Sequence, residues 1–176
     1  TGLATATNVF SLRNIPDMDQ IQAYIKTQNV QTATVIGGGF IGLEMMENLV
    51  ELGIDVQLVE MAPQVMPNVD FELAQQIHQQ INLHGVNLIL NDGLKEIQEA
   101  GKRLVLTSGQ VLQSDLTILS IGVTPENTLA KEAGLTLGFR GGVKVDHHFQ
   151  TSQKDIYAIG DMIEVTDFVT QEATHV

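Results

Sequence analysis

The sequence contains no cysteine in its 176 residues. Within these residues, that absence excludes a disulfide scaffold, a thiolate metal site and a thiol nucleophile. The sequence also lacks any run of about 18 or more apolar residues, which a membrane-spanning helix needs. Its start, TGLATATNVFSLR, shows no basic end followed by an apolar block, as a signal peptide would. We therefore expect a soluble, cytoplasmic protein that has no membrane partner.

Basic residues are scarce. Nine Lys and Arg stand against 21 Asp and Glu, which gives a formal net charge of -12. A nucleic-acid surface normally needs a basic stripe, so we expect no nucleic-acid partner and interpret the acidic excess as a solvated surface. Between Lys26 and Lys95 there is no Lys or Arg. An anion bound in that part of the chain must be held by backbone N–H groups and helix dipoles.

Strand and helix patterns alternate along the chain, which predicts an α/β fold with a parallel sheet. We expect helices at residues 17–28, 40–53, 70–85 and 125–134 and strands at 31–38, 54–60, 86–90, 116–121 and 156–159. From Leu94, short alternating runs punctuated by Ala100-Gly101 and Ser108-Gly109 predict an inserted antiparallel β-meander.

Apolar spacing predicts the buried faces of two helices. The expected stripes are Ile41, Met45 and Leu49 on one helix, and Leu73, Ile77 and Ile81 on the next. Gly53 occupies the place of a left-handed C-cap.

Three glycines, Gly37, Gly39 and Gly42, fit the pattern G-x-G-x-x-G directly after an apolar strand and at the start of a helix. In that context the first glycine permits a tight turn, the second lets the backbone approach a pyrophosphate, and the third lets helix and strand pack closely. The N–H groups at the helix N-terminus then face the phosphates. A lone pattern of this kind is often only a turn, but its context here predicts a Rossmann-like βαβ dinucleotide-binding domain.

An acid ends the next strand, since Glu60 follows Gly37 by 23 residues. This is near the spacing expected for a carboxylate that accepts hydrogen bonds from the adenosine ribose hydroxyls. The 2′-phosphate of NADPH would meet that carboxylate with no cation beside it, so we predict NADH in preference to NADPH. The alternative is that a distant basic residue folds back toward the site; the candidates are Lys102, Arg103, Lys131 and Arg140.

The remaining candidate residues carry weaker signals. Asp161 follows Gly160 after the apolar run at residues 156–159, where a ligand-facing carboxylate is common, although Gly-Asp alone is more often a turn. No metal site is expected. His147 and His148 should face opposite sides of a strand, and His78 and His84 are out of one-turn register on a helix.

Three segments, TVIGGGFIGLE…VELGIDVQLVE, LTILSIGVTPEN and TSQKDIYAIGD, occur in an order that resembles the flavin-dependent pyridine nucleotide-disulfide oxidoreductases. The similarity is greatest to their coenzyme A-disulfide reductase, NADH oxidase and NADH peroxidase branch. It extends from FSLRNIPDMDQI to about Asp161.

The resemblance implies a role for each matching residue. The NADH pyrophosphate would bind to Gly37, Gly39 and Gly42. Glu60 would bind the adenosine ribose, and Gly122 would lie against the nicotinamide half. Phe40 would be the aromatic gate where nicotinamide stacks on flavin, and Glu44 would lie close to that ring. Gly160 and Asp161 would belong to the FAD site. From the residues alone, Phe40 could instead be a helix-start residue packed on the sheet, and Glu44 an exposed first-turn acid.

Parts of the family pattern are missing here, namely a second glycine fingerprint for FAD, a redox cysteine and a C-terminal dimerisation domain. We therefore predict an NADH-binding fragment of a homodimeric flavoenzyme that passes hydride from NADH to FAD, and on to a cysteine-based centre or to oxygen or peroxide. The fragment alone should be inactive. The expected parts are an FAD-domain stub at 1–29, the NADH-binding domain at 30–148 and a return segment at 149–176. The alternative is a stand-alone NAD-sensing module without catalysis.

Overall fold

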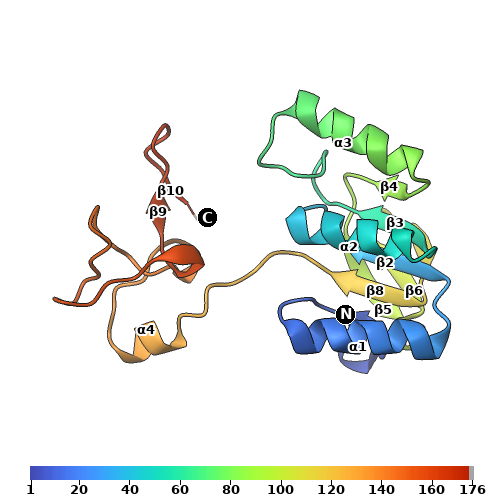
Figure 1. Ribbon diagram of the computed structural model, residues 1–176, viewed down its shortest axis with the longest axis horizontal. Helices are drawn as coiled ribbons and strands as arrows, with labels where there is room; N and C mark the ends of the chain where they lie inside the picture. Colours follow the sequence, from blue (N-terminus) through green and yellow to red (C-terminus); the bar gives the residue numbers. More distant parts are fainter. Residues whose placement is uncertain (175–176) are drawn as a thin grey trace. The chain divides into compact units, whose positions relative to one another are not determined.

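The structure is a computed structural model that describes residues 1–174 (Figure 1). The chain divides into two compact units, of which the first spans Thr1–Gly122 and the second begins at Val123. None of the helices within residues 1–174 has both the length and the apolar character needed to cross a bilayer.

The first unit is built on a five-stranded parallel sheet with strand order β1-β8-β2-β3-β4. Its strands are β1 (Val9–Phe10), β2 (Thr32–Ile36), β3 (Asp55–Val59), β4 (Asn87–Ile89) and β8 (Leu116–Leu119). The antiparallel meander consists of β5 (Leu94–Gln98), β6 (Arg103–Leu106) and β7 (Val111–Gln113). The helices are α1 (Ile15–Gln28), α2 (Phe40–Glu51) and α3 (Phe71–Leu83), with short 3-10 turns at Leu3–Thr5 and Glu99–Gly101.

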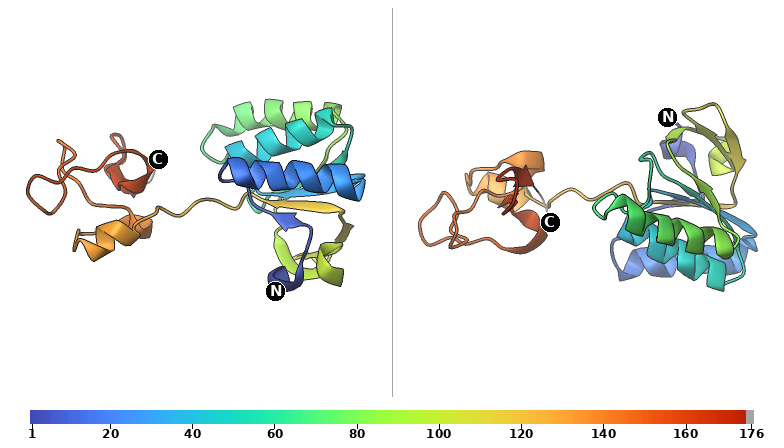
Figure 2. Two further views of the ribbon diagram at one scale, coloured as in Figure 1. Left: turned by 60° about the horizontal axis from the view of Figure 1, so that its bottom comes forward. Right: turned by 90° about the horizontal axis from the view of Figure 1, so that it is seen from above.

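The parallel sheet is covered on both faces. Helices α1, α2 and α3 lie on one face and the meander lies on the other (Figure 2). Ile21, Leu49 and Ile81 from the helices pack with strand residues in the larger core, whereas Ile36 and Val59 turn toward the meander. Burial on both faces explains why the strands read as continuous apolar runs. The predicted α/β class with a parallel sheet and an inserted meander is confirmed. The sequence did not predict strand β1 or its parallel pairing with β8.

The buried helix faces differ from the predicted stripes. On α2 the buried residues are Gly42, Met46 and Leu49, while Ile41 is exposed and Met45 only half-buried. On α3 they are Ala74, His78 and Ile81, while Leu73 is exposed. On each helix the buried face is therefore rotated about the helix axis relative to the predicted apolar face. The reason is that Gly42 on α2 and His78 on α3, a small and a polar residue, lie where the helix comes closest to the sheet or its loops.

Local sequence signals fix the helix ends. The Asn14 side chain accepts from the Asp17 backbone N–H at 3.0 Å, and the Asp17 carboxylate accepts from the Asn14 N–H at 3.0 Å. This reciprocal capping box starts α1 two residues before the predicted start. After α2, Gly53 has φ +77 as predicted, and the N–H of Ile54 donates to Leu49.

The second unit contains little regular structure. Its elements are α4 (Thr128–Glu132), β9 (Val165–Thr166) and β10 (Ala173–Thr174), with 3-10 turns at Phe139–Gly141 and Gly160–Met162. Ala130, Val143, Ala158 and Ile163 form its small core.

Two predictions about the second unit are wrong. Residues 156–159 form no strand, because Tyr157 makes only an isolated bridge to Gln150 and no ladder continues from it. His147 and His148 lie in a turn rather than on a strand, and their ring centroids are 3.9 Å apart. The reason is the Asp146 carboxylate, which accepts from the N–H groups of His148 and Gln150 and closes that turn.

Candidate functional site

Residues 37–39, which we call the glycine turn, join the central strand β2 to helix α2 at the carboxyl edge of the parallel sheet. The N–H of Gly37 donates to the carbonyl of Val59 at 2.8 Å, which ties the turn to the neighbouring strand. Gly37 has φ +106, and a Cβ atom there would overlap the carbonyl oxygen of Ser120. Only glycine can make this turn without strain.

Gly42 and Ser120 hold helix and strands together behind the turn. A Cβ atom on Gly42 would overlap the carbonyl oxygen of Gly37, so the third glycine permits the close packing expected of it. The Ser120 hydroxyl lies within hydrogen-bonding distance of the carbonyls of Ile36, at 2.9 Å, and Gly37, at 3.0 Å. Ser120 was not foreseen, since a serine at a strand end carries no signal of its own in the sequence.

Gly39 is the N-cap of α2, and its surroundings differ from those of the other two motif glycines. Its backbone is extended, with φ -80, and within the part of the chain that the structure describes no atom lies within 4 Å of where its Cβ would stand. Since no side chain caps this end of α2, its first N–H groups lack the partner that an Asn or Ser would provide. The open space and the uncapped amides fit an anionic group such as a pyrophosphate.

The Glu60 carboxylate lies against the glycine turn. One of its oxygens accepts from the N–H of Gly38 at 2.6 Å, and the other from the N–H of Ala62 at 2.7 Å. Each carboxylate oxygen has a second lone pair for a further donor. Glu60 therefore stabilises the conformation of the turn as well as lying beside it. The spacing between Gly37 and Glu60 did not predict this structural role.

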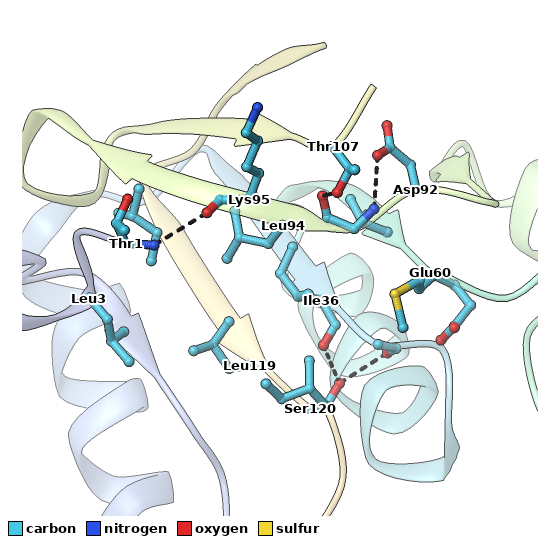
Figure 3. Close-up of a pocket in the computed structure, with 16 residues that line it drawn as sticks. Thr1, Leu3, Ile36, Glu60, Asp92, Leu94, Lys95, Thr107, Leu119 and Ser120 are labelled. Carbon is cyan, nitrogen blue, oxygen red and sulfur yellow. Dashed lines mark hydrogen bonds between the residues drawn. The ribbon is translucent and has the colours of Figure 1, made fainter. Parts of the chain in front are cut away.

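A cavity of about 690 Å³ opens beside Gly37 and Glu60, between the carboxyl ends of the parallel strands and strand β5 (Figure 3). Its floor and walls are mostly apolar, from residues such as Ile36, Leu94 and Leu119. The polar residues Glu60, Ser120 and Thr107 also belong to its lining. Apolar walls with a few convergent polar groups are typical of a small-molecule site.

Two further polar residues line the cavity and were missed. Asp92 is 6% exposed, and its carboxylate accepts from the N–H groups of Gly93, at 2.8 Å, and Ser108, at 3.1 Å. The Ser108 hydroxyl also donates to it, and this bond is the main cause that holds the pKa of Asp92 below its usual value. Lys95 also belongs to the lining, but it is exposed and its side chain points away from the cavity (Figure 3). The turn signal Asn91-Asp92-Gly93 after an apolar strand could have identified Asp92.

The other residues predicted for the first unit lie near its carboxyl edge or on α2. Phe40 is 68% exposed, so it is not packed on the sheet. Glu44 is exposed on the first turn of α2. Gly122, with φ +102, follows Ile121, which lines the cavity. The structure thus brings the glycines, Glu60 and the start of α2 together.

Gly160 and Asp161 belong to the second unit. Both are exposed, and they open the 3-10 turn Gly160–Met162, where Gly160 has φ +75.

Two of the basic residues considered for a 2′-phosphate lie in the first unit, away from the glycine turn. Burial raises the pKa of Asp115, but the N–H groups of Thr32, at the beginning of β2, and Gln31 donate to its carboxylate and hold that pKa below its usual value, with a smaller contribution from the charge of Lys102. The Arg103 guanidinium donates to the Gln98 side chain. Lys131 and Arg140 belong to the second unit. Among residues 1–174 no group of three or more His, Asp or Glu side chains could hold a metal ion.

Comparisons with known proteins give the family. The family model for pyridine nucleotide-disulphide oxidoreductases matches residues 2–175. An NADH oxidase of Methanocaldococcus jannaschii is 38% identical over 94% of this chain and 37% of its own length. A coenzyme A disulfide reductase of Staphylococcus epidermidis is 32% identical over 88% of this chain and 35% of its own length.

A solved structure agrees with these relatives. The crystal structure of reduced Bacillus anthracis CoADR-RHD has a TM-score of 0.95 and 54% sequence identity, covering 99% of this chain and 31% of that one. The chain thus spans about a third of the length of the proteins it matches. The family model covers nearly all of the sequence, and the chain belongs to the pyridine nucleotide-disulphide oxidoreductase family.

Proposed function

We propose that this chain is the NADH-binding domain of a longer flavoprotein, in which hydride passes from NADH to FAD and then to a cysteine-based centre or to oxygen or peroxide. The observation that carries the proposal is the open, uncapped start of α2 at Gly39, with Glu60 fixed beside it. The parent protein is proposed to be a cytoplasmic homodimer. Within it, residues 1–29 are proposed to be a stub of the FAD domain, residues 30–148 the NADH-binding domain, and residues 149–176 the segment that returns to the FAD domain.

In the proposed complex the glycine turn binds the pyrophosphate through backbone N–H groups and the N-terminus of α2. Glu60 uses its free lone pairs to accept from the adenosine ribose hydroxyls. Gly122 lies against the nicotinamide half, with Glu44 close to that ring. When bound, NADH supplies the hydride. Phe40, which is largely exposed, is the proposed gate at which nicotinamide meets the flavin, and Gly160 and Asp161 contact FAD.

The proposed preference for NADH depends on the negative charge of Glu60. A 2′-phosphate beside this carboxylate would place two like charges together, while the carboxylate remains held by the N–H groups of Gly38 and Ala62. No Lys or Arg follows Glu60 in the sequence before Lys95, whose side chain points away from the cavity (Figure 3). The name of the M. jannaschii relative, an NADH oxidase, supports the same preference.

Glu60→Gln should reduce the discrimination between the two nucleotides, because the amide removes the charge, although it keeps only one of the two acceptors that bind Gly38 and Ala62. The double variant Glu60→Gln with Met61→Arg should reverse it, since Met61 is 79% exposed and follows Glu60 directly. Calorimetric titration of the chain with NADH and with NADPH measures the ratio of the two dissociation constants. We expect the ratio to change by about tenfold or more, or about 1.4 kcal/mol.

Glu47→Gln is the matched control, since it removes the same charge from an exposed site on α2 that has no proposed part in binding. Its ratio should stay close to that of the wild type. Equal affinities of the wild type for NADH and NADPH, or an unchanged ratio in both Glu60 variants, would show that Glu60 does not select the nucleotide.

The visible absorption spectrum of the natural gene product tests the flavoprotein proposal. We expect flavin bands that are bleached when NADH is added, because reduced flavin loses its visible absorption. A spectrum with flavin bands that NADH leaves unchanged would contradict the proposed hydride transfer. A colourless protein that still binds NADH would instead favour a stand-alone NAD-sensing module.

The sensing module remains the second candidate because of one observation, the absence of cysteine from all 176 residues. A regulatory domain needs no redox thiol, whereas the proposed cysteine-based centre must come from residues outside this sequence. The names of the relatives, an NADH oxidase and a coenzyme A disulfide reductase, favour the first proposal.

A further inference from the structure

The segment that follows Glu60, residues 61–69, contains no ionisable side chain. It connects β3 to α3 and begins with Met61, which lines the cavity. Within the segment, the side-chain amide of Gln64 donates to the carbonyls of Met66, at 3.3 Å, and Val69, at 2.9 Å, and the N–H of Val69 donates to the carbonyl of Met66 at 3.0 Å. We call residues 61–69 the adenosine-side segment.

This segment is attached directly to the glycine turn. The N–H of Met66 donates to the carbonyl of Gly38 at 2.9 Å, while the N–H of Gly38 donates to Glu60. Both polar backbone groups of Gly38 are therefore held by residues 60–66. Val65 is fully buried beneath the turn, and a Cβ atom on Gly38 would stand 2.9 Å from the Val65 side chain. Any shift of Val65 would be transmitted to Gly38 and to the Glu60 carboxylate.

A histidine on α3 fixes the backbone of Val65. His78 is 8% exposed, and its Nε2 accepts from the N–H of Val65 at 3.1 Å. Nε2 can accept only while it carries no proton, so this bond requires the neutral ring. A protonated ring would leave two N–H donors facing each other in a buried place.

Among the described residues, no charged group offsets this requirement. The adenosine-side segment and strand β4 have no ionisable side chains. On α3, the positions one turn from His78 are Ala74, Gln75, Ile81 and Asn82, and Glu72 is exposed near the start of the helix. The acids of α2, which are Glu44, Glu47 and Glu51, are all exposed. Desolvation by burial is the cause that lowers the pKa of His78, with no charge contributing.

We propose that His78 is a positioning residue for nucleotide binding: in its neutral form it holds Val65, and through it the adenosine-side segment, in the place that orients Gly38 and Glu60. The proposal rests on the proposed function, since it deepens how the same site binds the adenosine half. It adds that this binding is weakened by protonation of a residue that does not touch the nucleotide.

The direction of the pH effect follows from the lowered pKa. Above about pH 6.5, the usual pKa of histidine, the ring is neutral in both folded and unfolded chains and the bond to Val65 is fully present. As the pH falls below that value the unfolded chain takes up a proton more readily than the folded one, so the stabilisation decreases. It is lost once the pH passes the lower pKa of the folded state.

ADP-ribose is a suitable probe, because it carries the adenosine half and lacks the acid-sensitive reduced nicotinamide. We expect its affinity for the chain to fall about three- to tenfold, the loss of one hydrogen bond, as the pH is lowered from about 7.5 through the lowered pKa of His78 in the folded chain. His78→Gln, whose amide can accept from Val65 but does not titrate, should bind with a smaller pH dependence. His84→Gln is the matched control, since His84 is exposed at the end of α3, and it should keep the wild-type profile.

A second measurement needs no variant. In the wild-type chain without nucleotide, the Val65 backbone N–H signal in an NMR pH titration should shift with the His78 ring. A Val65 signal that does not follow the ring, or equal pH profiles for wild type and His78→Gln, would overturn the proposal. Failure of the wild type to bind ADP-ribose at any pH would instead contradict the proposed function. The Val65 titration would still test whether His78 accepts a hydrogen bond from Val65.

Discussion

Gly39→Asp should abolish nucleotide binding without unfolding the chain. Aspartate is among the best N-cap residues, so the change is expected to leave helix α2 as stable as before or to stabilise it by about a few tenths of a kcal/mol. The side chain would enter the open space at the start of α2, where no atom of residues 1–174 lies within 4 Å of the Cβ position. In the proposed complex that space holds the pyrophosphate, and like charges there repel strongly. NADH affinity should fall about 100-fold or more, or about 2.7 kcal/mol.

Gly39→Asn is the matched control for this variant, because asparagine caps the helix equally well and carries no charge. Its affinity should lie between those of the wild type and Gly39→Asp, since the side chain still fills part of the space. Calorimetry gives the affinities and thermal unfolding gives the stabilities. Normal NADH binding by a well-folded Gly39→Asp chain would place the pyrophosphate elsewhere and remove the main support for the proposed function.

Gly37→Ala is expected to have the largest effect on stability. At φ +106 an alanine is strained, and its Cβ would overlap the backbone carbonyl of Ser120, which cannot move without breaking the β2–β8 pairing. The two effects together should lower the free energy of unfolding by about 3 kcal/mol or more. Urea denaturation followed by circular dichroism measures the loss.

Gly109→Ala separates the two causes. Gly109 also has a positive φ, +92, but no atom lies within 4 Å of its Cβ position among the described residues. It should lose only the conformational part, about 1–2 kcal/mol. Equal losses in the two variants would mean that the contact between Gly37 and Ser120 does not restrict the turn.

The sequence predicted elements correctly where several local signals, such as a glycine motif and the strand and helix patterns beside it, agreed with one another. Gly37, Gly39 and Gly42 follow a strand, open a helix and precede a strand that ends in Glu60, and all of these elements lie where predicted. The meander was marked by Ala100-Gly101 and Ser108-Gly109, which do form its turns. Periodicity failed for Ile41 and Leu73, because it locates an apolar face only to within about one residue's rotation.

The residues that were missed act through contacts between segments far apart in the chain. Ser120 meets the carbonyl of Gly37 across 83 residues, and Asp92 binds Ser108 across 16. His78 was considered only as a metal ligand, because its acceptor role depends on where the loop brings Val65. The run at residues 156–159 resembled a strand, but a strand also needs a partner ladder, which composition does not supply.

The order of strands in the sheet also sets when the glycine turn is completed during folding. Strands β2, β3 and β4 follow one another in the chain, so their pairing and the contact of Gly38 with Glu60, 22 residues apart, require only short loops to close. Strand β8 joins β2 only after the meander has been passed, and Ser120 reaches Gly37 with it. Contacts of low sequence separation form fastest. The Glu60 side of the turn should therefore form first, and the Ser120 side should close it late.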